Sequence, residues 1–237
     1  SVAGKMDPHD ERSKLIHRFF DVVEMTTPSA FVCENVKALA VLSRWGALRG
    51  KILKRAERLG YRIALVVLNA SEFGTPQARE RMFLLGIHSD LTSLSNEELQ
   101  AEFVKRLEQH KAQAPTMAQV IRRLGRAGNE RNSAVCNAKV TFAKNPVLRK
   151  SPYAGMLFNG AGRPIDPNGV SSTLPASMGG NKTPIVDEAE IFDGKPSYVV
   201  NYHRRLWNGG KPRTGAAPSR LRRLTIDECL AIQTFPE

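Results

Sequence analysis

Apolar and polar residues along the first half of the chain predict helices and strands in turn. Apolar positions recur at helical spacing from Glu11 to Met25. The segments that follow are expected to form a strand, a helix and two strands, at residues 30–33, 36–59, 61–68 and 82–87. Helix, strand, helix, strand is typical of an α/β domain, so we expect a mostly parallel sheet.

Glycines and capping residues mark where several of these elements end. The second helix is expected to break near Gly46 and Gly50 and to end at Gly60. A last helix begins at Thr225, where Glu228 completes a capping box. Further polar helices are predicted at 95–110 and 117–124.

From residue 128 the composition shifts toward glycine, proline, serine and asparagine. Strands are short there and loops hold most of the residues, which predicts a smaller, loop-rich and mostly β second domain. We therefore expect three segments: an α/β domain over 1–127, the loop-rich domain over 128–215, and a helix over 216–237 that returns to the first domain.

The chain is strongly basic, with 35 Lys and Arg against 23 Asp and Glu and a net charge of +12. No acidic residue lies between Glu130 and Asp166 or between Asp193 and Asp227, whereas these stretches hold six and eight Lys and Arg residues. Such one-signed stretches favour a surface that faces the phosphates of a nucleic acid. A solvated basic face or a tail would carry the same charge, but the interleaved aromatic residues argue against a disordered tail.

The three cysteines, Cys33, Cys136 and Cys229, are far apart and form no Cys-x-x-Cys pair. They imply neither a disulfide framework nor a structural zinc site, and we expect no metal. A reducing cytoplasm fits this cysteine usage. The sequence contains no apolar run long enough to cross a membrane and no signal-peptide pattern near residue 1.

An acidic residue stands at the end of the apolar run 30–33, where Glu34, Asn35 and Val36 follow. An apolar run of this kind suits a buried parallel strand that brings its last residues to the carboxyl edge of the sheet. Ligands of open α/β sheets bind at that edge. Glu34 is therefore a candidate catalytic acid for a nucleotide base.

Two arginines precede the last apolar run of the first half. A turn is expected at Gly74 and Pro76, after which Gln77, Arg79 and Arg81 alternate onto one face of the next strand. Guanidinium groups on that face would offer planar donors to carbonyl or phosphate oxygens. An edge strand with a charged outer face would show the same pattern.

Three short motifs follow one another along the chain. They are Glu34-Asn35-Val36, Gln77-x-Arg79-x-Arg81, and Arg223-Leu224-Thr225-x-x-Glu228 before Gln233-Thr234-Phe235-Pro236. In this order they resemble the cytosine-5 DNA methyltransferases of the bacterial restriction–modification kind. Each motif alone is weak, but three in order are specific, and the resemblance covers nearly the whole chain. It implies part of a Rossmann-like, S-adenosylmethionine-dependent methyltransferase sheet, with a target-recognition domain over 128–215.

The resemblance implies a reaction on a cytosine that is flipped out of double-stranded DNA. A cysteine thiolate attacks C6, C5 takes the methyl group of S-adenosylmethionine, and an elimination restores the ring. Glu34 stands at the position of the acid that donates to N3 and stabilises the developing charge, and we expect it to be protonated in the complex. Arg81 matches an arginine that contacts O2 of the base, and Arg79 matches a neighbour that braces the catalytic loop. Asn35 is interpreted as architectural, fixing the strand-to-helix turn.

The resemblance also implies DNA contacts in the basic half of the chain. The loop 159–163 lies where family members insert a residue into the space left by the flipped base, and Arg163 is the candidate for a bidentate contact to guanine. Thr173 begins a stretch that resembles a segment gripping phosphate near the flipped nucleotide. The DNA-binding candidates are Asn159, Gly160, Arg163, Thr173, Ser177, Gly179, Gly180 and Lys182.

Parts of the family pattern are missing from this sequence. No Pro-Cys pair occurs, and the glycine-rich strand and loop that open the family's cofactor site are absent too. Of the cofactor pocket only Leu15 has a counterpart, at a position that packs beside the adenine. We therefore expect an incomplete portion, inactive alone, that needs an N-terminal portion or a complementary subunit carrying the nucleophilic cysteine.

The cysteines that are present are not expected to replace that nucleophile. Cys33 precedes Glu34 on a strand and should point to the opposite face. The alternative function is a non-catalytic, sequence-specific DNA-binding module on the same fold. Glu34, Arg79 and Arg81 weigh against it, because a pure binder has no use for an acid at a strand end. The recognised DNA sequence depends on loop geometry and does not follow from the residues alone.

Overall fold

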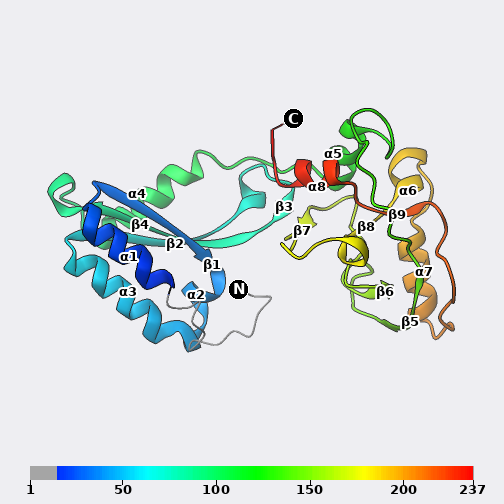
Figure 1. Cartoon of the computed structure of the whole chain (residues 1–237), viewed down its shortest axis with the longest axis horizontal. Coiled ribbons are helices and arrows are strands. Elements are labelled where there is room, and N and C mark those ends of the chain that lie inside the picture. The colour runs from blue at the N-terminus through cyan, green and yellow to red at the C-terminus, as the bar shows by residue number, and fades with distance from the viewer. Residues whose placement is uncertain (1–14, 237) are drawn as a thin grey trace. The chain divides into compact units, whose positions relative to one another are not determined.

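A three-stranded sheet forms the centre of the first of two units in this computed structural model, which describes residues 15–236. Unit 1 consists of the described residues up to Phe73 together with Arg79–Ala112. Unit 2 consists of Gly74–Ala78 and the described residues from Gln113 onward. In Figure 1, the elements of unit 1 run from blue to green and most of those of unit 2 from green to red.

Helices and strands alternate in unit 1. In chain order they are α1 (Leu15–Thr26), β1 (Ala30–Val36), α2 (Lys37–Val41), α3 (Gly46–Arg58), β2 (Tyr61–Asn69), β4 (Glu80–His88) and α4 (Asn96–Glu108). Short 3₁₀ turns cover Ser43–Trp45, Ala70–Glu72 and Ser89–Leu91. The helix expected over 36–59 is therefore interrupted before Gly46, which begins α3, whereas Gly50 lies inside α3.

The strand order is β1–β4–β2, and β4 runs antiparallel to both of its neighbours. The α/β class is confirmed, but the expectation of a mostly parallel sheet is wrong for the described strands. β1 and β2 run in the same direction without pairing. The cause is the connection from β2 to β4 at residues 70–79, which reverses the chain and is too short for the helical crossover that parallel pairing needs.

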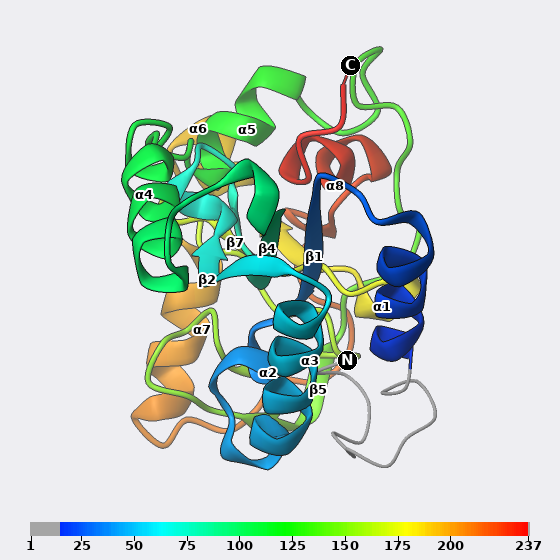
Figure 2. The same cartoon turned by 90° about the vertical axis from the view of Figure 1, so that its left-hand side faces the viewer.

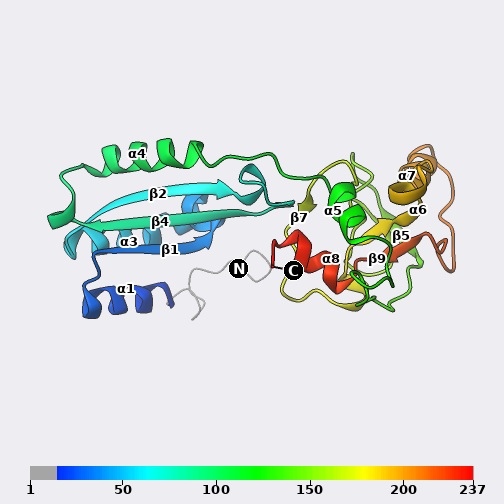
Figure 3. The ribbon, with the colours of Figure 1, turned by 90° about the horizontal axis from the view of Figure 1, so that it is seen from above.

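The two faces of the sheet are covered by different helices. Phe31, Cys33 and Leu84 are buried on one face, in a core to which α1 and α3 contribute (Figure 2). The rings of Phe20 and Phe31 meet edge to face there, with centroids 5.7 Å apart. Such a pair contributes about 0.5–1.5 kcal/mol beyond the burial of its area. Helix α4 lies on the opposite side of the sheet from α1 (Figure 3).

The two outer edges of the sheet differ. On β2, the backbone N–H of Ile63 donates to Asn96 Oδ1 of α4 at 2.8 Å. The N–H of Leu65 donates to Gln100 Oε1 at 3.3 Å, so α4 closes this edge with side-chain amides. Within residues 15–236, β1 pairs with β4 alone, and its residue Val32 is 59% exposed. β1 is therefore an open edge strand with one buried face, not the fully buried strand that its apolar run suggested.

Unit 2 combines short strands with helices. In chain order these are β3 (Gln77–Ala78), α5 (Met117–Leu124), β5 (Phe142–Val147), β6 (Met156–Phe158), β7 (Ser171–Ser172), a 3₁₀ turn (Gly180–Lys182), β8 (Ile185–Asp187), α6 (Glu188–Asp193), α7 (Tyr198–Trp207), β9 (Leu221–Arg223) and α8 (Ile226–Ile232). The strands pair as β3–β7, β5–β6 and β8–β9. No helix in the described part of the chain is long and apolar enough to cross a membrane.

The division between the units comes after Ala112, earlier than the boundary after residue 127 that the composition suggested. Helix α5 belongs to unit 2 because Met117 and Ile121 are fully buried in a core shared with Ile232 of α8. The described part of the segment 216–237 belongs to unit 2 as well, where α8 packs in the same core as α5.

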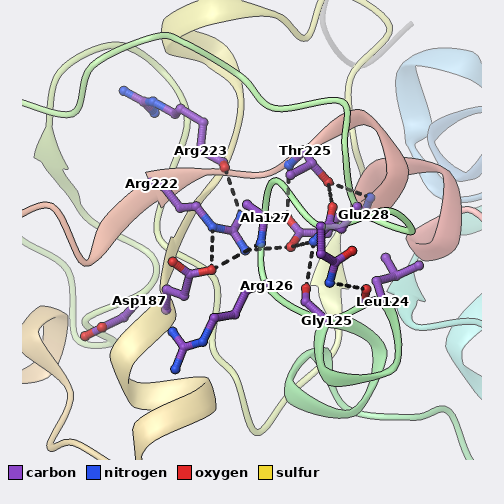
Figure 4. Close-up of polar contacts among 12 residues, drawn as sticks. Leu124, Gly125, Arg126, Ala127, Asp187, Arg222, Arg223, Thr225 and Glu228 are labelled. Carbon is purple, nitrogen blue, oxygen red and sulfur yellow. Dashed lines mark hydrogen bonds and ion pairs between the residues drawn. The ribbon is translucent and has the colours of Figure 1, made fainter.

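A buried polar cluster fixes the start of α8 (Figure 4). Thr225 and Glu228 form the expected capping box. Glu228 is completely buried, and its carboxylate accepts from the two terminal nitrogens of Arg222 at 2.9 and 2.7 Å and from Asn132 Nδ2 at 3.0 Å. Burial opposes the charge of Arg222, but its hydrogen bonds to Glu228 and the negative charges of Glu228 and Glu188 outweigh burial and raise its pKa. Removing one partner would leave a buried charge uncompensated, a cost of about 3–5 kcal/mol.

The packing of Gly86 makes one stability prediction. Gly86 lies directly opposite Phe31 in the sheet, and a Cβ on Gly86 would come within 2.3 Å of the Phe31 ring. Because Phe20 and Tyr61 confine that ring, Gly86→Ala should destabilise unit 1 by about 1–3 kcal/mol through overpacking. Urea unfolding of a Trp207→Phe background would measure this, since Trp45 then reports on unit 1 alone.

Gly50→Ala is the matched control for Gly86→Ala. Gly50 lies inside α3 and its added Cβ would meet no atom within 4 Å. The control should therefore stabilise unit 1 by about 0.5–1 kcal/mol, the usual helix preference for Ala. Equal stabilisation by both substitutions would contradict the packing described for Phe31.

Candidate active site and DNA-facing groove

Glu34 and Arg81 meet where β1 ends and β4 begins. In the antiparallel register Val36 lies opposite Arg81, so Glu34 is a diagonal neighbour of Arg81 on the same face of the sheet. The distance from Arg81 Nε to Glu34 Oε1 is 2.8 Å. The side chain of Arg81 is 20% exposed and that of Glu34 is 48% exposed. The pair thus presents a carboxylate to solvent beside a guanidinium that is largely fixed in place.

Local hydrogen bonds hold the end of β1 in position. Asn35 Oδ1 accepts from the backbone N–H of Val36 at 2.8 Å, at the junction of β1 and α2. Lys37 Nζ then lies 2.6 Å from Glu80 Oε1, which ties the start of α2 to the start of β4. Asn35 therefore makes a local hydrogen bond at the strand-to-helix junction, and its architectural role stays a prediction.

Arg79 and Gln77 have different surroundings from Arg81. The backbone N–H of Arg79 donates to Asn69 Oδ1 at 3.0 Å, and its carbonyl accepts from Ala70 N at 3.0 Å. Gln77 is buried in β3, which pairs with Ser171 of β7 in unit 2. The expectation that Gln77, Arg79 and Arg81 share one strand face is therefore wrong for Gln77. β3 ends at Ala78, before β4 begins.

The three cysteines have different surroundings. Cys33 is buried on the other face of the sheet, opposite Leu84, as the alternation of the strand requires. Burial, and then the charge of Glu34, raises the pKa of the Cys33 thiol. Cys229 is buried in α8, where desolvation raises its pKa to about 12. Cys136 belongs to unit 2. Neither Cys33 nor Cys229 is therefore an accessible thiolate.

A groove of about 580 Å³ in unit 2 gathers half of the DNA-binding candidates. Arg163, Thr173, Ser177 and Lys182 all line it, and each of these residues is exposed. Tyr153 lines it too, and burial raises the pKa of its phenol to about 12, so the phenol stays neutral at physiological pH. Two cations and several hydroxyl groups, against the single carboxylate of Asp166, suit the groove to a phosphate backbone.

The other DNA-binding candidates lie on loops beside this groove. Gly179 and Gly180 are exposed, and Gly160 has a φ of +74°. Asn159 is committed to the fold, because its Oδ1 accepts from Thr141 N at 3.0 Å and from Arg223 Nη2 at 2.8 Å, and its Nδ2 donates to Lys139 O at 3.1 Å. Asn159 therefore positions the loop, and its side chain is not free for DNA.

Three bases of the second acid-free stretch point into the protein. Arg220 contacts Asp187 Oδ1 at 2.6 Å, Arg222 binds Glu228, and Arg223 is 1% exposed. The stretch as a whole is therefore not a phosphate-facing surface. The basic stretch itself gives no sign of these internal partners, because residues such as Asp187 and Thr183 are distant in sequence.

A cofactor or metal site is not assembled by the described residues. Leu15 begins α1 and is 64% exposed, so it offers one aliphatic side chain to solvent. Among residues 15–236, no three His, Cys, Asp or Glu side chains come together as metal ligands.

Comparison with known proteins identifies the family. Residues 1–237 match the family described as C-5 cytosine-specific DNA methylase. This chain belongs to that family. The type II methyltransferase M1.HphI of Haemophilus parahaemolyticus is 27% identical over 240 residues, which cover 100% of this chain and 56% of the relative. The type II methyltransferase M.AgeI of Thalassovita gelatinovora is 41% identical over 86 residues, which cover 36% of this chain and 20% of the relative.

This C-5 cytosine-specific DNA methylase chain thus spans about half the length of M1.HphI. Among solved structures, the Dnmt2 methyltransferase of S. pombe matches 97% of this chain and 63% of its own, with a TM-score of 0.55 and 14% identity. The Entamoeba histolytica methyltransferase EhMeth matches 96% of this chain and 58% of its own, with a TM-score of 0.52 and 14% identity. Both likenesses concern the fold.

The burial of Cys33 and Cys229 predicts their reactivity. Both thiols have raised pKa values, that of Cys229 about 12, so at pH 8 each remains protonated and unreactive. Iodoacetamide treatment of the folded chain followed by peptide mass spectrometry should find them unmodified while half-buried Cys136 reacts. Modification of Cys33 or Cys229 at the rate of the urea-unfolded chain would contradict the structure.

Proposed function

We propose that this chain provides one half of the catalytic site of a DNA (cytosine-5) methyltransferase, together with the surface that recognises its DNA target. The observation that carries the proposal is the Glu34–Arg81 pair at the end of β1, in a chain that belongs to the C-5 cytosine-specific DNA methylase family. A role in restriction and modification is supported by relatives named type II methyltransferases.

The chemistry of Glu34 and Arg81 suits a flipped cytosine. A protonated carboxyl group donates to ring N3 and its second oxygen accepts from the exocyclic amine, a combination that thymine does not offer. Arg81 keeps N–H donors beyond the one that faces Glu34, and these suit O2 of the base. When a nucleophile attacks C6, negative charge develops on the ring, and both groups stabilise it.

The nucleophile of this reaction is proposed to come from a second portion of the fold. Cys33 lies on the wrong face, and Cys229 is buried and protonated. Among residues 15–236 the outer edge of β1 has no strand partner and could accept an added strand next to Glu34, whereas α4 closes the edge of β2. A portion that adds to β1 and carries a Pro-Cys pair would bring a thiolate to the face of Glu34.

S-adenosylmethionine is the methyl donor that membership of the family implies, and when bound it supplies an electrophilic methyl group. Of its site we assign only Leu15 to the described residues, with an aliphatic side chain that is 64% exposed. The remainder of that site is assigned to the second portion as well.

Double-stranded DNA is the proposed substrate of the groove in unit 2. The net charge of +12 and the exposed Arg163 and Lys182 favour phosphates, and Arg163 has the geometry to bind guanine with two donors. A non-catalytic DNA-binding module would use the same groove. The Glu34–Arg81 pair favours the enzyme, since binding DNA needs no carboxylate there.

Complementation separates these two functions. The chain is mixed with a polypeptide that carries the Pro-Cys pair, with DNA and with S-adenosylmethionine labelled in its methyl group. If the chain is part of an enzyme, the mixture should form labelled 5-methylcytosine and the chain alone should form none. DNA binding without methyl transfer in the mixture would favour the binding module.

Glu34→Gln should lower methyl transfer by the complemented protein by about 100-fold or more, because the amide cannot donate a proton to N3. DNA affinity should stay nearly unchanged. Glu80→Gln is the matched control, since Glu80 is also an ion-paired strand residue with a side chain 47% exposed, against 48% for Glu34. Equal turnover of the two variants would show that Glu34 takes no part in catalysis.

Arg163→Ala should cost about 1–3 kcal/mol of binding to the preferred DNA sequence and relax the choice at one base pair. The preferred sequence is obtained by selecting from a random duplex pool, and affinities are then measured by fluorescence anisotropy. Arg204→Ala provides the control, because Arg204 is exposed on α7 outside the groove. An equal loss of affinity for all DNA sequences would show that Arg163 contacts phosphate and not a base.

A further inference from the structure

We infer that Arg223 is a positioning residue for sequence recognition, which joins the loops 159–163 and 179–183 into one rigid reading surface. This inference rests on the proposed DNA-binding role of unit 2. Arg163 and Lys182 lie on these two loops, so the spacing between a base contact and a phosphate contact depends on how the loops are held together.

Arg223 connects the two loops through its guanidinium. Its Nη2 donates to the carbonyl and the side-chain oxygen of Asn159 at 2.9 and 2.8 Å. Its Nη1 donates to Thr183 O at 2.8 Å and Gly162 O at 3.4 Å. The loop containing Arg163 and the loop containing Lys182 are thus bound to the same rigid planar group.

The position of Arg223 on β9 explains why it reaches these loops. Arg222 and Arg223 are consecutive strand residues, so their side chains leave the strand on opposite sides. Arg222 binds Glu228, whereas Figure 4 shows the side chain of Arg223 directed away from that cluster. Adjacent arginines therefore have separate tasks, one in the core of unit 2 and one beneath the loops.

The partners of Arg223 are neutral oxygens. Within the described residues it forms no ion pair with a carboxylate, and desolvation lowers its pKa. Burying a cation among neutral carbonyl groups costs free energy of folding. The role of Arg223 is therefore inferred from the fixed spacing that it gives the two loops and not from a gain in stability. Lysine could not replace it, because an ammonium is a point charge without the planar fork that spans these acceptors.

The two loops also touch through their backbones. Gly162 N donates to Asn181 O at 3.1 Å. A Cβ on Gly160 would lie 2.1 Å from Asn181 O, and a Cβ on Gly162 would lie 1.9 Å from Thr183 O. This close approach needs glycine at both positions, and it leaves the loops no independent freedom while Arg223 holds them.

Arg223→Lys tests the inference in the full chain, with Arg222→Lys as the matched control. Preferred and scrambled duplexes are titrated, and hydrogen exchange of the Gly162 and Thr183 amides is followed. Arg223→Lys should speed exchange of these amides and lower the preference for the selected duplex by roughly 10-fold or more, about the loss of one good base contact. The affinity of Arg223→Lys for the scrambled duplex should stay unchanged. Arg222→Lys should lower the urea midpoint of unit 2 and leave the preference intact.

A second pair of variants tests the loops without changing Arg223. Gly160→Ala forces the loops apart, whereas Gly194→Ala places the same residue at a similar positive φ of +63° with no atom within 4 Å. Gly160→Ala should reproduce the loss of preference, and Gly194→Ala should not. A preference retained in both Arg223→Lys and Gly160→Ala, or lost equally in Arg222→Lys, would overturn the inference. If the unaltered chain prefers no sequence, the proposed function fails, while the exchange of the two amides still tests the connection made by Arg223.

Discussion

The candidate catalytic site depends on the antiparallel register between β1 and β4. Val36 opposite Arg81 makes Glu34 and Arg81 diagonal neighbours on one face, and it places Cys33 on the other face with Leu84. A shift of one residue would exchange these faces, moving Glu34 into the aromatic core and Cys33 to solvent. The burial of Phe31 beside Gly86 holds the register, so the packing of the core decides which side chains meet at the site.

A comparable division of labour occurs in unit 2. On β9, the side chain of Arg222 forms a buried bidentate pair with Glu228 and so anchors α8. The side chain of Arg223 donates to carbonyl groups beneath two exposed loops. These arginines therefore already have internal partners and do not supply the positive charge of the candidate DNA-binding groove. Its free cations, Arg163 and Lys182, lie on the loops themselves.

Local sequence signals predicted the elements well where they act over a few residues. The capping box at Thr225 forms as expected, and the helix over 117–124 has the expected bounds. The direction of β4 did not follow from periodicity, because parallel and antiparallel strands show the same alternation of side chains. The destination of α5 was also hidden, since an amphipathic helix does not reveal which core its apolar face joins.

Site prediction shows the same limit. Glu34 and Arg81 were found as separate motifs, and the structure brings them within 2.8 Å. Asn159 and the arginines at 220, 222 and 223 were interpreted as DNA-facing, because a polar residue in a basic stretch gives no sign of its internal partners. Those partners, such as Thr183 O, come from segments distant in sequence, and only the fold assembles them.

The two outer edges of the sheet support the division of the catalytic site between two portions. Helix α4 blocks β2, whereas no strand in the described part of the chain covers the edge of β1 beside Glu34. The most direct measurement is 5-methylcytosine formation by a chain in which Cys33, Cys136 and Cys229 are all replaced by alanine, combined with the portion that carries the Pro-Cys pair. A nucleophile that belongs to the second portion predicts methyl transfer at the rate of the unaltered chain. Loss of methyl transfer in this folded, DNA-binding variant would place the nucleophile within this chain and contradict the account.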